Sequence, residues 1–298
     1  SDLANNEAKN PRISVHHASQ VIGMDEHPGQ ALRKKKDASV VVATSLVRDN
    51  RCDAVIAPGS TGAAVAAALF GLGRIKGIDR PVIATPMPTV SGITVMLDSG
   101  ANSNSKPKHL VQGALMGSEY AKLLLGKENP TVGLLNIGEE ATKGNDVVLA
   151  TYPILEGMKT INFKGNIEGR DIPKGAVDVV VCDGFVGNVV LKFAEGLVTG
   201  LTQLVKDSIM AGSIFAKIGA MLVKPALKKM AKRLDHTENG GAPLLGVNGV
   251  FMIAHGSSKA KEIKTAIEIA SDLVERKIIQ HIRETMDIEG ALKYDYDE

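Results

Sequence analysis

Tryptophan is absent from this 298-residue chain, which has only four tyrosines and six phenylalanines. Capture of single-stranded nucleic acid depends on stacking bases against aromatic rings, so this composition argues against it. The formal net charge is only +2, which does not suggest a protein that binds polyanions in general. We therefore expect no nucleic-acid partner, and any basic feature that matters must be local.

Cysteine is also scarce. Cys52 and Cys182 are too few for a disulfide framework, so a reducing cytosol is expected. The Cys and His spacings match no zinc pattern, and no G-x-S-x-G nucleophile elbow occurs. Cys182 is expected to be a buried small hydrophobe, because no His lies near it in sequence. We expect neither a metal nor a cofactor.

Long apolar runs are missing as well. No stretch reaches 18 apolar residues, from which we expect no membrane-spanning segment. We expect no signal peptide at the start of the chain either. The sequence begins SDLANNEAKN without an initiator Met, as a start inside a longer parent would.

What is present is an alternation of short apolar runs with longer helical stretches. The expected strands are Ile13–His16, Asp53–Ala57, Val82–Thr85, Thr94–Leu97, Thr131–Asn136, Thr160–Phe163, Val177–Cys182 and Val250–Ile253. The expected helices are Pro28–Arg48, Thr61–Leu72, Lys108–Leu125, Lys143–Leu155, Gly187–Met210 and Ser258–Thr285. This alternation predicts an α/β fold with a largely parallel sheet flanked by helices.

Many of the 31 glycines gather where a predicted strand ends. In open α/β sheets, ligands bind outside the carboxyl ends of strands, where backbone must approach them closely. An ordinary tight turn is the alternative explanation for any single glycine. Six such corners, several of which carry Asn, Asp, Ser or Thr, favour one shared cleft.

The first corner, with sequence APGSTG, follows a strand and opens a helix. Its N–H groups and hydroxyls would attract an anion such as phosphate, which makes Gly59, Ser60, Thr61 and Gly62 candidate ligands. Ser60 or Thr61 can equally be no more than an N-cap. The corner is neither a Walker A loop nor G-x-G-x-x-G.

The second and third corners add charged and amide groups. Asp98, Asn102 and Lys106 could orient a polar ligand, although an Asx-turn at Asp98 explains the pattern equally well. Lys143, followed by Asn145, is expected near the first turn of a helix. The helix dipole disfavours a cation there. A bound anion beside Lys143 would explain why a lysine occurs at this position.

The last three corners supply the remaining candidates, which are Asn166, Asp183, Asn188, Gly240, Gly241 and His255. Asp183 and Asn188 could hold a polar group of a substrate or cap the helix that follows. His255 ends a strand at the same presumed edge of the sheet as the other corners. This position favours a functional role more than it would for a lone His elsewhere, which is usually structural.

A basic amphipathic segment spans residues 208–235. Six basic and no acidic residues lie between Ser208 and Leu234, and apolar residues recur among them at helical spacing. Pro225 is expected to break the segment into two helices. Such a hairpin could lie on an anionic membrane through Phe215, Leu222, Lys224, Lys228 and Lys229. A packed hairpin with a solvated basic face, or a dimer contact, is the alternative.

Taken together, these motifs resemble the PlsX family, the bacterial phosphate acyltransferases that make acyl phosphate for phospholipid synthesis. The resemblance runs from about Ile13 to Glu284. Its most specific segments are Arg33–Lys36, Ala57–Ala63, Gly73–Pro81, Leu97–Asn102, Val132–Glu140, Gly165–Asp171, Asp178–Asn188, Gly240–Gly246 and Ala254–Ser258.

Three departures from the family pattern stand out. Members usually carry Ala-Gly-Asn-Thr-Gly where this chain has Pro58–Gly62, and Asp-Val-Gly-Ala-Asn where it has Asp98–Asn102. The family's opening strand, with its Asp-Ala-Met-Gly-Gly-Asp corner, is absent, because the sequence starts after it. If that strand were truly missing from the protein, the sheet would lose a strand and the cleft a wall.

The resemblance implies an isocitrate dehydrogenase/phosphotransacetylase-like fold over residues 1–298, in one unit or in two subdomains that share one cleft. It implies attack of inorganic phosphate on the thioester of acyl-acyl carrier protein in the cytoplasm, at the membrane surface. Gly59–Gly62, Lys143 and Asn145 would hold phosphate, and Asn166, Asp183 and Asn188 would line the acyl-thioester side. His255 would act on the reacting groups, by polarising or protonating them.

The long last helix and the resemblance also favour a homodimer. Two other hypotheses stay open. One is a phosphate acetyltransferase-like enzyme that acts on acyl-CoA, and the other is a non-catalytic scaffold at a membrane surface or on a carrier protein.

Overall fold

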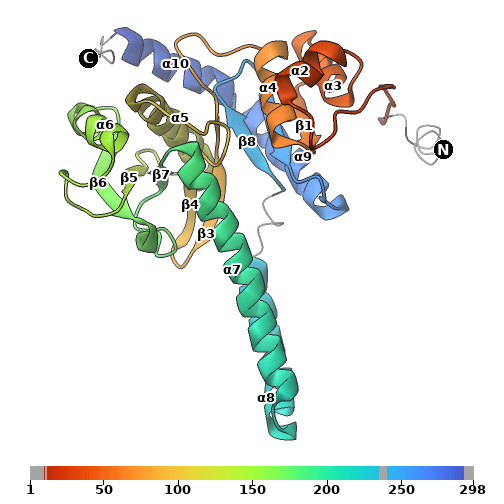
Figure 1. Cartoon of the computed structure of the whole chain (residues 1–298), viewed down its shortest axis with the longest axis vertical. Helices are drawn as coiled ribbons and strands as arrows, with labels where there is room; N and C mark the ends of the chain where they lie inside the picture. Colours follow the sequence, from red (N-terminus) through yellow and green to blue (C-terminus); the bar gives the residue numbers. More distant parts are fainter. Residues whose placement is uncertain (1–9, 11, 235–239, 292–298) are drawn as a thin grey trace.

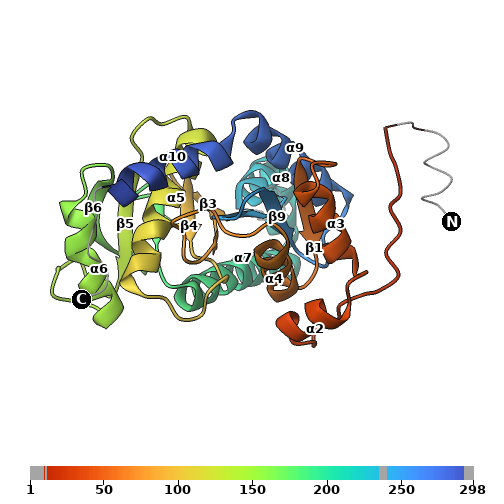
Figure 2. The ribbon, with the colours of Figure 1, turned by 90° about the horizontal axis from the view of Figure 1, so that it is seen from above.

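The computed structural model describes residues 10, 12–234 and 240–291, and its strands form two sheets (Figures 1 and 2). The five-stranded sheet has the order β3-β4-β7-β5-β6. Only β3 runs antiparallel to its neighbour. Its strands are β3 (Thr85–Thr89), β4 (Gly92–Leu97), β5 (Thr131–Asn136), β6 (Asn162–Glu168) and β7 (Val179–Val181).

The second sheet has four strands in the order β1-β9-β8-β2. Its strands are β1 (Ala54–Pro58), β2 (Val82–Ile83), β8 (Ala242–Leu245) and β9 (Val250–Ala254). Only β1 and β9 are parallel, and β8 is antiparallel to both of its neighbours. The α/β class predicted from the sequence is therefore confirmed, but the strands divide between two sheets, each with an antiparallel component.

Helices cover both sheets. They are α2 (Pro28–Lys34), α3 (Ser39–Arg48), α4 (Thr61–Gly71), α5 (Pro107–Leu125), α6 (Asp146–Gly157), α7 (Gly184–Ala211), α8 (Ile214–Leu234), α9 (Ala260–Glu275) and α10 (Ile278–Ala291), with a 3-10 turn at Gly169–Asp171. Alternate residues of β9 separate the two faces of the four-stranded sheet: Phe251 packs with α3 and α4, whereas Met252 packs with α9.

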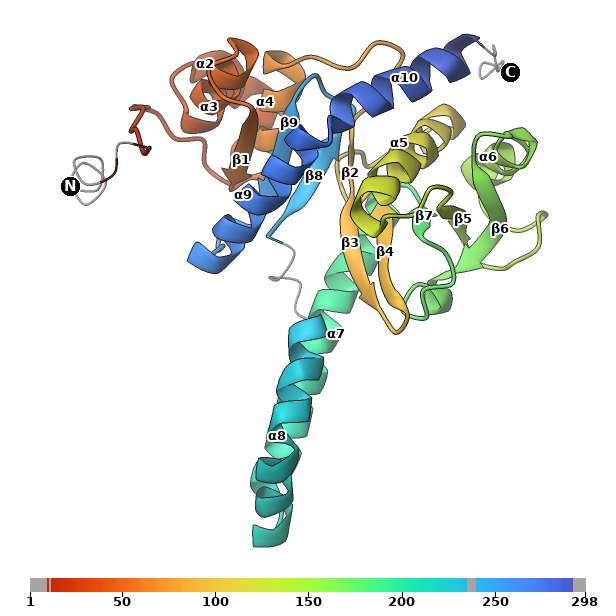
Figure 3. The same cartoon turned by 180° about the vertical axis from the view of Figure 1, so that it is seen from behind.

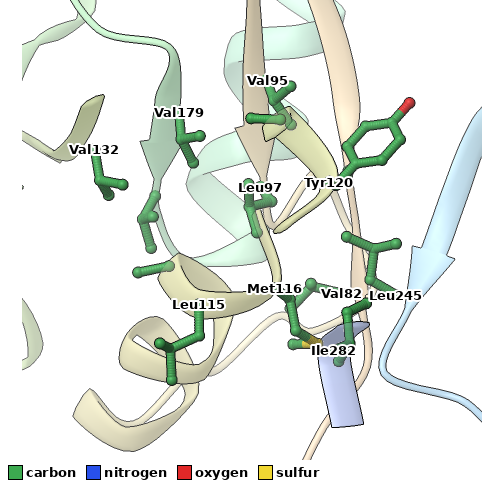
Figure 4. Close-up of a cluster of buried hydrophobic side chains, with 14 of the residues drawn as sticks. Val82, Val95, Leu97, Leu115, Met116, Tyr120, Val132, Val179, Leu245 and Ile282 are labelled. Atoms are coloured by element: carbon green, nitrogen blue, oxygen red, sulfur yellow. The ribbon is translucent and has the colours of Figure 1, made fainter. Parts of the chain in front are cut away.

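One hydrophobic cluster joins the two sheets (Figure 4). Leu97 and Val179 of the five-stranded sheet and Leu245 of the four-stranded sheet belong to it, together with Met116 of α5 and Ile282 of α10. Leu97, Val179 and Met116 are fully buried, and truncating such a side chain to Ala typically costs about 2–5 kcal/mol. The two sheets therefore share one core, which fixes their relative position.

A long helical hairpin projects from this body (Figures 1 and 3). It consists of α7 and α8, with the turn at Gly212–Ser213. Only Gly184 and Gly187 are buried in α7. By length and composition, α7 is the one helix in the described part of the chain that could cross a membrane, whereas no membrane-spanning segment was expected from the sequence.

Several expected elements differ from the observed ones. Ile13–His16 is not a strand, and Ile13 and Val15 are both 46% exposed because no sheet covers them. The first long helix is interrupted between α2 and α3. The last one is interrupted at Lys277, whose φ of 54° is left-handed.

The basic hairpin also differs from its prediction, because α8 continues through Pro225. Pro225 leaves the carbonyl of Met221 without its helical donor. Met221 is an exposed residue, so water can satisfy that carbonyl. The turn of the hairpin therefore lies before Ile214, and residues 208–211 end α7. Position 235, where the predicted segment ended, lies outside the described residues.

Candidate active site

The turn after β4 is organised around the carboxylate of Asp98, which is only 3% exposed. Its Oδ1 accepts from the N–H groups of Ile83, Gly100 and Ala101 at 3.1, 3.1 and 2.9 Å. Its Oδ2 accepts from the backbone N and the Nδ2 of Asn102, both at 2.8 Å. Burial raises the pKa of Asp98, and the hydrogen bonds oppose that rise. Asp98 therefore builds the turn, with both oxygens occupied by protein donors.

The start of α7 is pressed against this turn. Asp183 is the N-cap: its Oδ1 accepts from the N–H of Phe185, and its Oδ2 accepts from the N–H of Ser105, both at 2.8 Å. A Cβ on Gly187 would lie 2.0 Å from the carbonyl oxygen of Asp98. Only glycine allows this approach, so the turn and the helix are held in a single arrangement.

The first cavity has a volume of about 600 Å³. Most of its lining side chains are apolar, with a few amide, hydroxyl and carboxylate groups among them. The lining comprises Ser103, Asn104, Ser105, Leu110, Leu135, Asn136, Ile137, Gly144, Asn145, Val147, Val148, Cys182, Asp183, Phe185 and Val186. A largely apolar wall with a few placed polar groups is typical of a site for an apolar ligand with a polar end.

The second cavity, of about 410 Å³, is richer in hydroxyl and charged groups. Those groups, with the glycines beside them, are Gly59, Ser60, Thr61, Thr85, Ser99, Gly100, Asn188, Lys192, Glu195, Gly240, Gly241, His255, Gly256, Ser258 and Glu262. The segment 98–105 and the start of α7 contribute residues to both cavities. The two cavities are therefore neighbours that share this wall.

The N-terminus of α4 faces the second cavity. Ser60 is its N-cap, and its Oγ accepts from the N–H of Ala63 at 3.4 Å. The first-turn amides of Thr61 and Gly62 have no partner within the helix, and the helix dipole places positive charge at this end. This end of α4 therefore suits an anion.

Close packing of backbone forms the opposite wall. Gly240 has a φ of 65°, and a Cβ there would lie 2.4 Å from the backbone N of Ala266 in α9. Gly240 and Gly241 thus bring the chain onto α9 and β9 with no intervening side chain.

Lys192 of α7 reaches His255 at the end of β9. Its Nζ lies 3.2 Å from Nε2 of His255 and 2.8 Å from Oε2 of Glu195. Because an ammonium group has donors only, Lys192 donates to both. Segments 63 residues apart in sequence are joined at this point of the cavity wall.

The structure divides the predicted site residues between the two cavities. Asn145 and Asp183 line the first cavity. The second is lined by Gly59, Ser60, Thr61, Asn188, Gly240, Gly241 and His255. The phosphate site expected from Gly59–Gly62 with Lys143 and Asn145 is therefore spread over two neighbouring cavities.

Other predicted residues lie outside both linings. Asn102 completes the Asp98 turn, and its Nδ2 also donates to the carbonyl of Pro81 at 2.7 Å. Lys106 is exposed and is the N-cap of α5. Gly62 packs against the ring of Pro28.

Lys143 and Asn166 flank the loop before α6. Lys143 is exposed, two residues before the N-cap Asn145, and its carbonyl accepts from Nδ2 of Asn136 at 2.8 Å. Asn166 of β6 is 6% exposed and donates from Nδ2 to the carbonyl of Glu140 at 3.0 Å. Its Oδ1 has no hydrogen-bond partner among the described residues.

Cys182 is buried, as expected. Burial raises the pKa of its thiol, and the carboxylates of Asp98 and Asp183 raise it further. The thiolate is therefore not populated near neutral pH, so Cys182 is no nucleophile. No group of three or more His, Cys, Asp and Glu side chains that could hold a metal occurs in residues 10, 12–234 and 240–291.

Sequence reasoning missed several polar residues of the second cavity, among them Thr85, Ser99, Lys192 and Glu195. A signal for two of them exists. Lys192 and Glu195 follow Asn188 at i+4 and i+7, which places all three on one face of the helix. Thr85 was expected to end the strand Val82–Thr85 but instead begins β3, TPMPT, whose two prolines conceal that strand in the sequence.

Comparisons with known proteins agree with one another. The family model described as "Fatty acid synthesis protein" matches residues 1–281. The chain is 55% identical over 276 residues to "Phosphate acyltransferase" of Desulfitobacterium hafniense, covering 92% of this chain and 82% of the relative. It is 57% identical over 273 residues to a protein of that name in Heliobacterium modesticaldum, covering 92% and 81%.

Solved structures share the fold. EutD phosphotransacetylase from Staphylococcus aureus superposes with a TM-score of 0.56 at 14% identity, covering 91% of this chain and 83% of the other. A phosphotransacetylase from Streptococcus pyogenes superposes with a TM-score of 0.52 at 16% identity, covering 87% and 70%. At these identities the likeness concerns the fold alone.

Proposed function

The chain belongs to the PlsX-type phosphate acyltransferase family of fatty acid synthesis proteins, and on that premise we propose that it transfers a fatty acyl group from acyl-acyl carrier protein to inorganic phosphate. Family membership bears out the resemblance seen in the corner motifs and makes the protein an acyltransferase. The carrier-protein donor and the residue roles that follow are proposals.

The observation that carries this proposal is the pair of neighbouring cavities, of which the first has mostly apolar side chains in its lining and the second has more hydroxyl and charged groups. The apolar first cavity suits the acyl chain. The second cavity, with the N-terminus of α4, suits phosphate. The two cavities share the segment 98–105 and the start of α7 in their linings, so an acyl group and an anion bound in them would be neighbours. Bringing two reactants together in this way supplies much of the rate of a bimolecular reaction.

The chemistry needs little acid–base assistance. A phosphate oxygen forms a bond to the thioester carbonyl carbon, the carbon–sulfur bond breaks, and the electron pair leaves with the phosphopantetheine thiolate. The negative charge that develops on the carbonyl oxygen must be stabilised. The N-terminus of α7, capped by Asp183 at the first cavity, and the amide of Asn188 at the second are the groups we assign to it.

The hairpin suits a membrane surface. Phe215 and Leu222 of α8 are 80% and 78% exposed, and Lys224, Lys228 and Lys229 are exposed on the same helix. Exposed apolar side chains among basic ones fit an anionic lipid surface. Peripheral membrane association in the cytoplasm would place this lipophilic product where it is used.

A second copy of the chain is the partner we propose for α7. Apolar residues repeat along α7 at i+4 spacing and are all exposed: Phe185, Val189, Phe193, Leu197, Leu201 and Val205. A row at i+4 spacing turns by about 40° around the helix axis at each step, so this seam winds along α7, and an exposed apolar surface of this extent indicates a partner. The homodimer was first expected from a long last helix, but that helix is interrupted. The proposal of a homodimer therefore rests on the exposed apolar seam of α7.

The test is release of thiol from acyl-acyl carrier protein, measured with and without inorganic phosphate. Phosphate-dependent release with formation of acyl phosphate is the expected result. Release from acyl-CoA but not from the carrier protein would replace the proposed donor. No release from either, with the fold intact, would leave the scaffold hypothesis.

A further inference from the structure

We infer that Lys192 is the cation of the phosphate site in the second cavity and that the hydroxyl of Thr85 is a further side-chain donor there; this inference rests on the proposed function. Neither residue stands out in the sequence. The ligand is a tetrahedral phosphate dianion, for which inorganic phosphate is the probe.

Lys192 is suited to this role because its ammonium group is held in place with one donor left over. Two of its three N–H donors are used, one by Glu195 and one by Nε2 of His255. No third partner occurs among the described residues. Two fixed partners remove much of the side-chain entropy that a lysine otherwise loses on binding, so the remaining N–H is preorganised.

Lys192 is also the one Lys or Arg among the described residues that line the second cavity. The two carboxylates of that lining are already engaged. Glu195 accepts from Lys192, and Oε2 of Glu262 accepts from the backbone N of Lys259 at 2.5 Å. The donors left for a ligand are the remaining N–H of Lys192, the hydroxyls of the lining and the first-turn amides of α4.

Thr85 supplies an independent observation. Its Oγ1 is buried and has no hydrogen-bond partner among the described residues, although Thr85 belongs to the cavity wall. Leaving a buried hydroxyl unsatisfied is costly. The cost is accounted for if Oγ1 is satisfied when the cavity is loaded. A phosphate oxygen, which accepts several hydrogen bonds, fits a hydroxyl and an ammonium at once.

The experiment measures equilibrium binding of inorganic phosphate, without any acyl donor, by titration calorimetry. Lys192→Met should weaken phosphate binding tenfold or more, because a charge-assisted hydrogen bond is lost. Lys192→Arg, which keeps the charge, should recover a large part of it. Lys206→Met is the matched control: Lys206 is an exposed lysine of the same helix outside both cavities, and this variant should bind phosphate like the parent.

Thr85→Val gives a signature that a purely structural hydroxyl would not give. It should weaken phosphate binding several-fold and at the same time raise the thermal stability of the phosphate-free protein, because an unsatisfied buried hydroxyl is removed. Weaker binding together with lower stability would mean that the hydroxyl has a protein partner, and would overturn its assignment.

The carrier protein's phosphopantetheine carries a phosphodiester, which is also a tetrahedral anionic group, and steady-state kinetics separate the two sources. In Lys192→Met we expect a raised KM for inorganic phosphate with an unchanged KM for the acyl donor. A raised KM for the acyl donor alone, or unchanged phosphate binding in this variant, would refute the role of Lys192. Because the calorimetric measurement needs no turnover, it stands or falls separately from the proposed acyl transfer.

Discussion

A methyl group on Gly187 should impair both stability and turnover. The Cβ of Gly187→Ala would lie 2.0 Å from the carbonyl oxygen of Asp98 and 2.9 Å from Sγ of Cys182. Carbon–oxygen contacts settle near about 3.3 Å or more, so the start of α7 must retreat from the Asp98 turn by about 1 Å. Overpacking of this kind costs about 1–3 kcal/mol, from which the better helix propensity of Ala recovers up to about 1 kcal/mol.

The effect on catalysis should exceed the effect on folding. The retreating segment forms the wall between the two cavities, and misplacing reacting groups by about 1 Å costs on the order of 100-fold in rate. Urea unfolding and steady-state turnover measure the two effects on one preparation.

Gly196→Ala is the control for this prediction. It lies in the same helix, and a Cβ there meets nothing within 4 Å. It should raise stability by about 0.5–1 kcal/mol and leave turnover unchanged. If Gly187→Ala instead behaved like Gly196→Ala, the close contact between α7 and the Asp98 turn would be wrong.

Three further predictions concern other parts of the molecule. Burial raises the pKa of Asp178, but hydrogen bonds from Lys127 and Thr131 outweigh burial and hold the pKa below its usual range. A lowered pKa stabilises above the unfolded value of 3.8, and that stabilisation is lost as pH falls through the folded value. In urea unfolding, Asp178→Asn should therefore cost about 1–3 kcal/mol equally at pH 7 and pH 5. This difference should shrink below about pH 4; a cost that stays constant into acid would contradict the assignment. Lys143→Ala tests the phosphate role that the family resemblance implied for this exposed lysine, which lies outside both cavity linings: that role requires turnover to fall more than about tenfold with the fold intact, and unchanged turnover and phosphate KM would remove Lys143 from the reaction. Leu222→Glu should reduce flotation with anionic liposomes, and undiminished flotation would defeat the membrane contact of α8.

Continuous apolar strands could be predicted from the sequence with little error. Thr131–Asn136 has the predicted bounds, because a strand buried on both faces needs apolar residues throughout. Strands β3 and β8 could not be predicted in this way. Both contain proline, which is tolerated in β3 because that strand lies at the edge of its sheet.

The glycine-rich corners correctly indicated where polar groups and cavities gather. They did not indicate how the site residues are divided between the two cavities. The division depends on how closely α7 approaches the Asp98 turn, a long-range contact with no local signature. Asp98 shows the same limit. Its neighbours in sequence suggest a ligand, whereas its burial and donors, including Ile83 from another strand, make it a structural anchor.

The helix α7 is subject to two different sets of constraints along its length. Its N-cap Asp183 lines the first cavity, and its first three turns hold Gly187 against the Asp98 turn and place Lys192 in the wall of the second cavity, so nearly every substitution there changes a distance in the site. The rest of its roughly 42 Å length stands clear of the body and needs only an apolar stripe. A saturation mutagenesis map of this single helix should therefore change character near Gly196: intolerant and residue-specific before it, tolerant and governed only by polarity and periodicity after it.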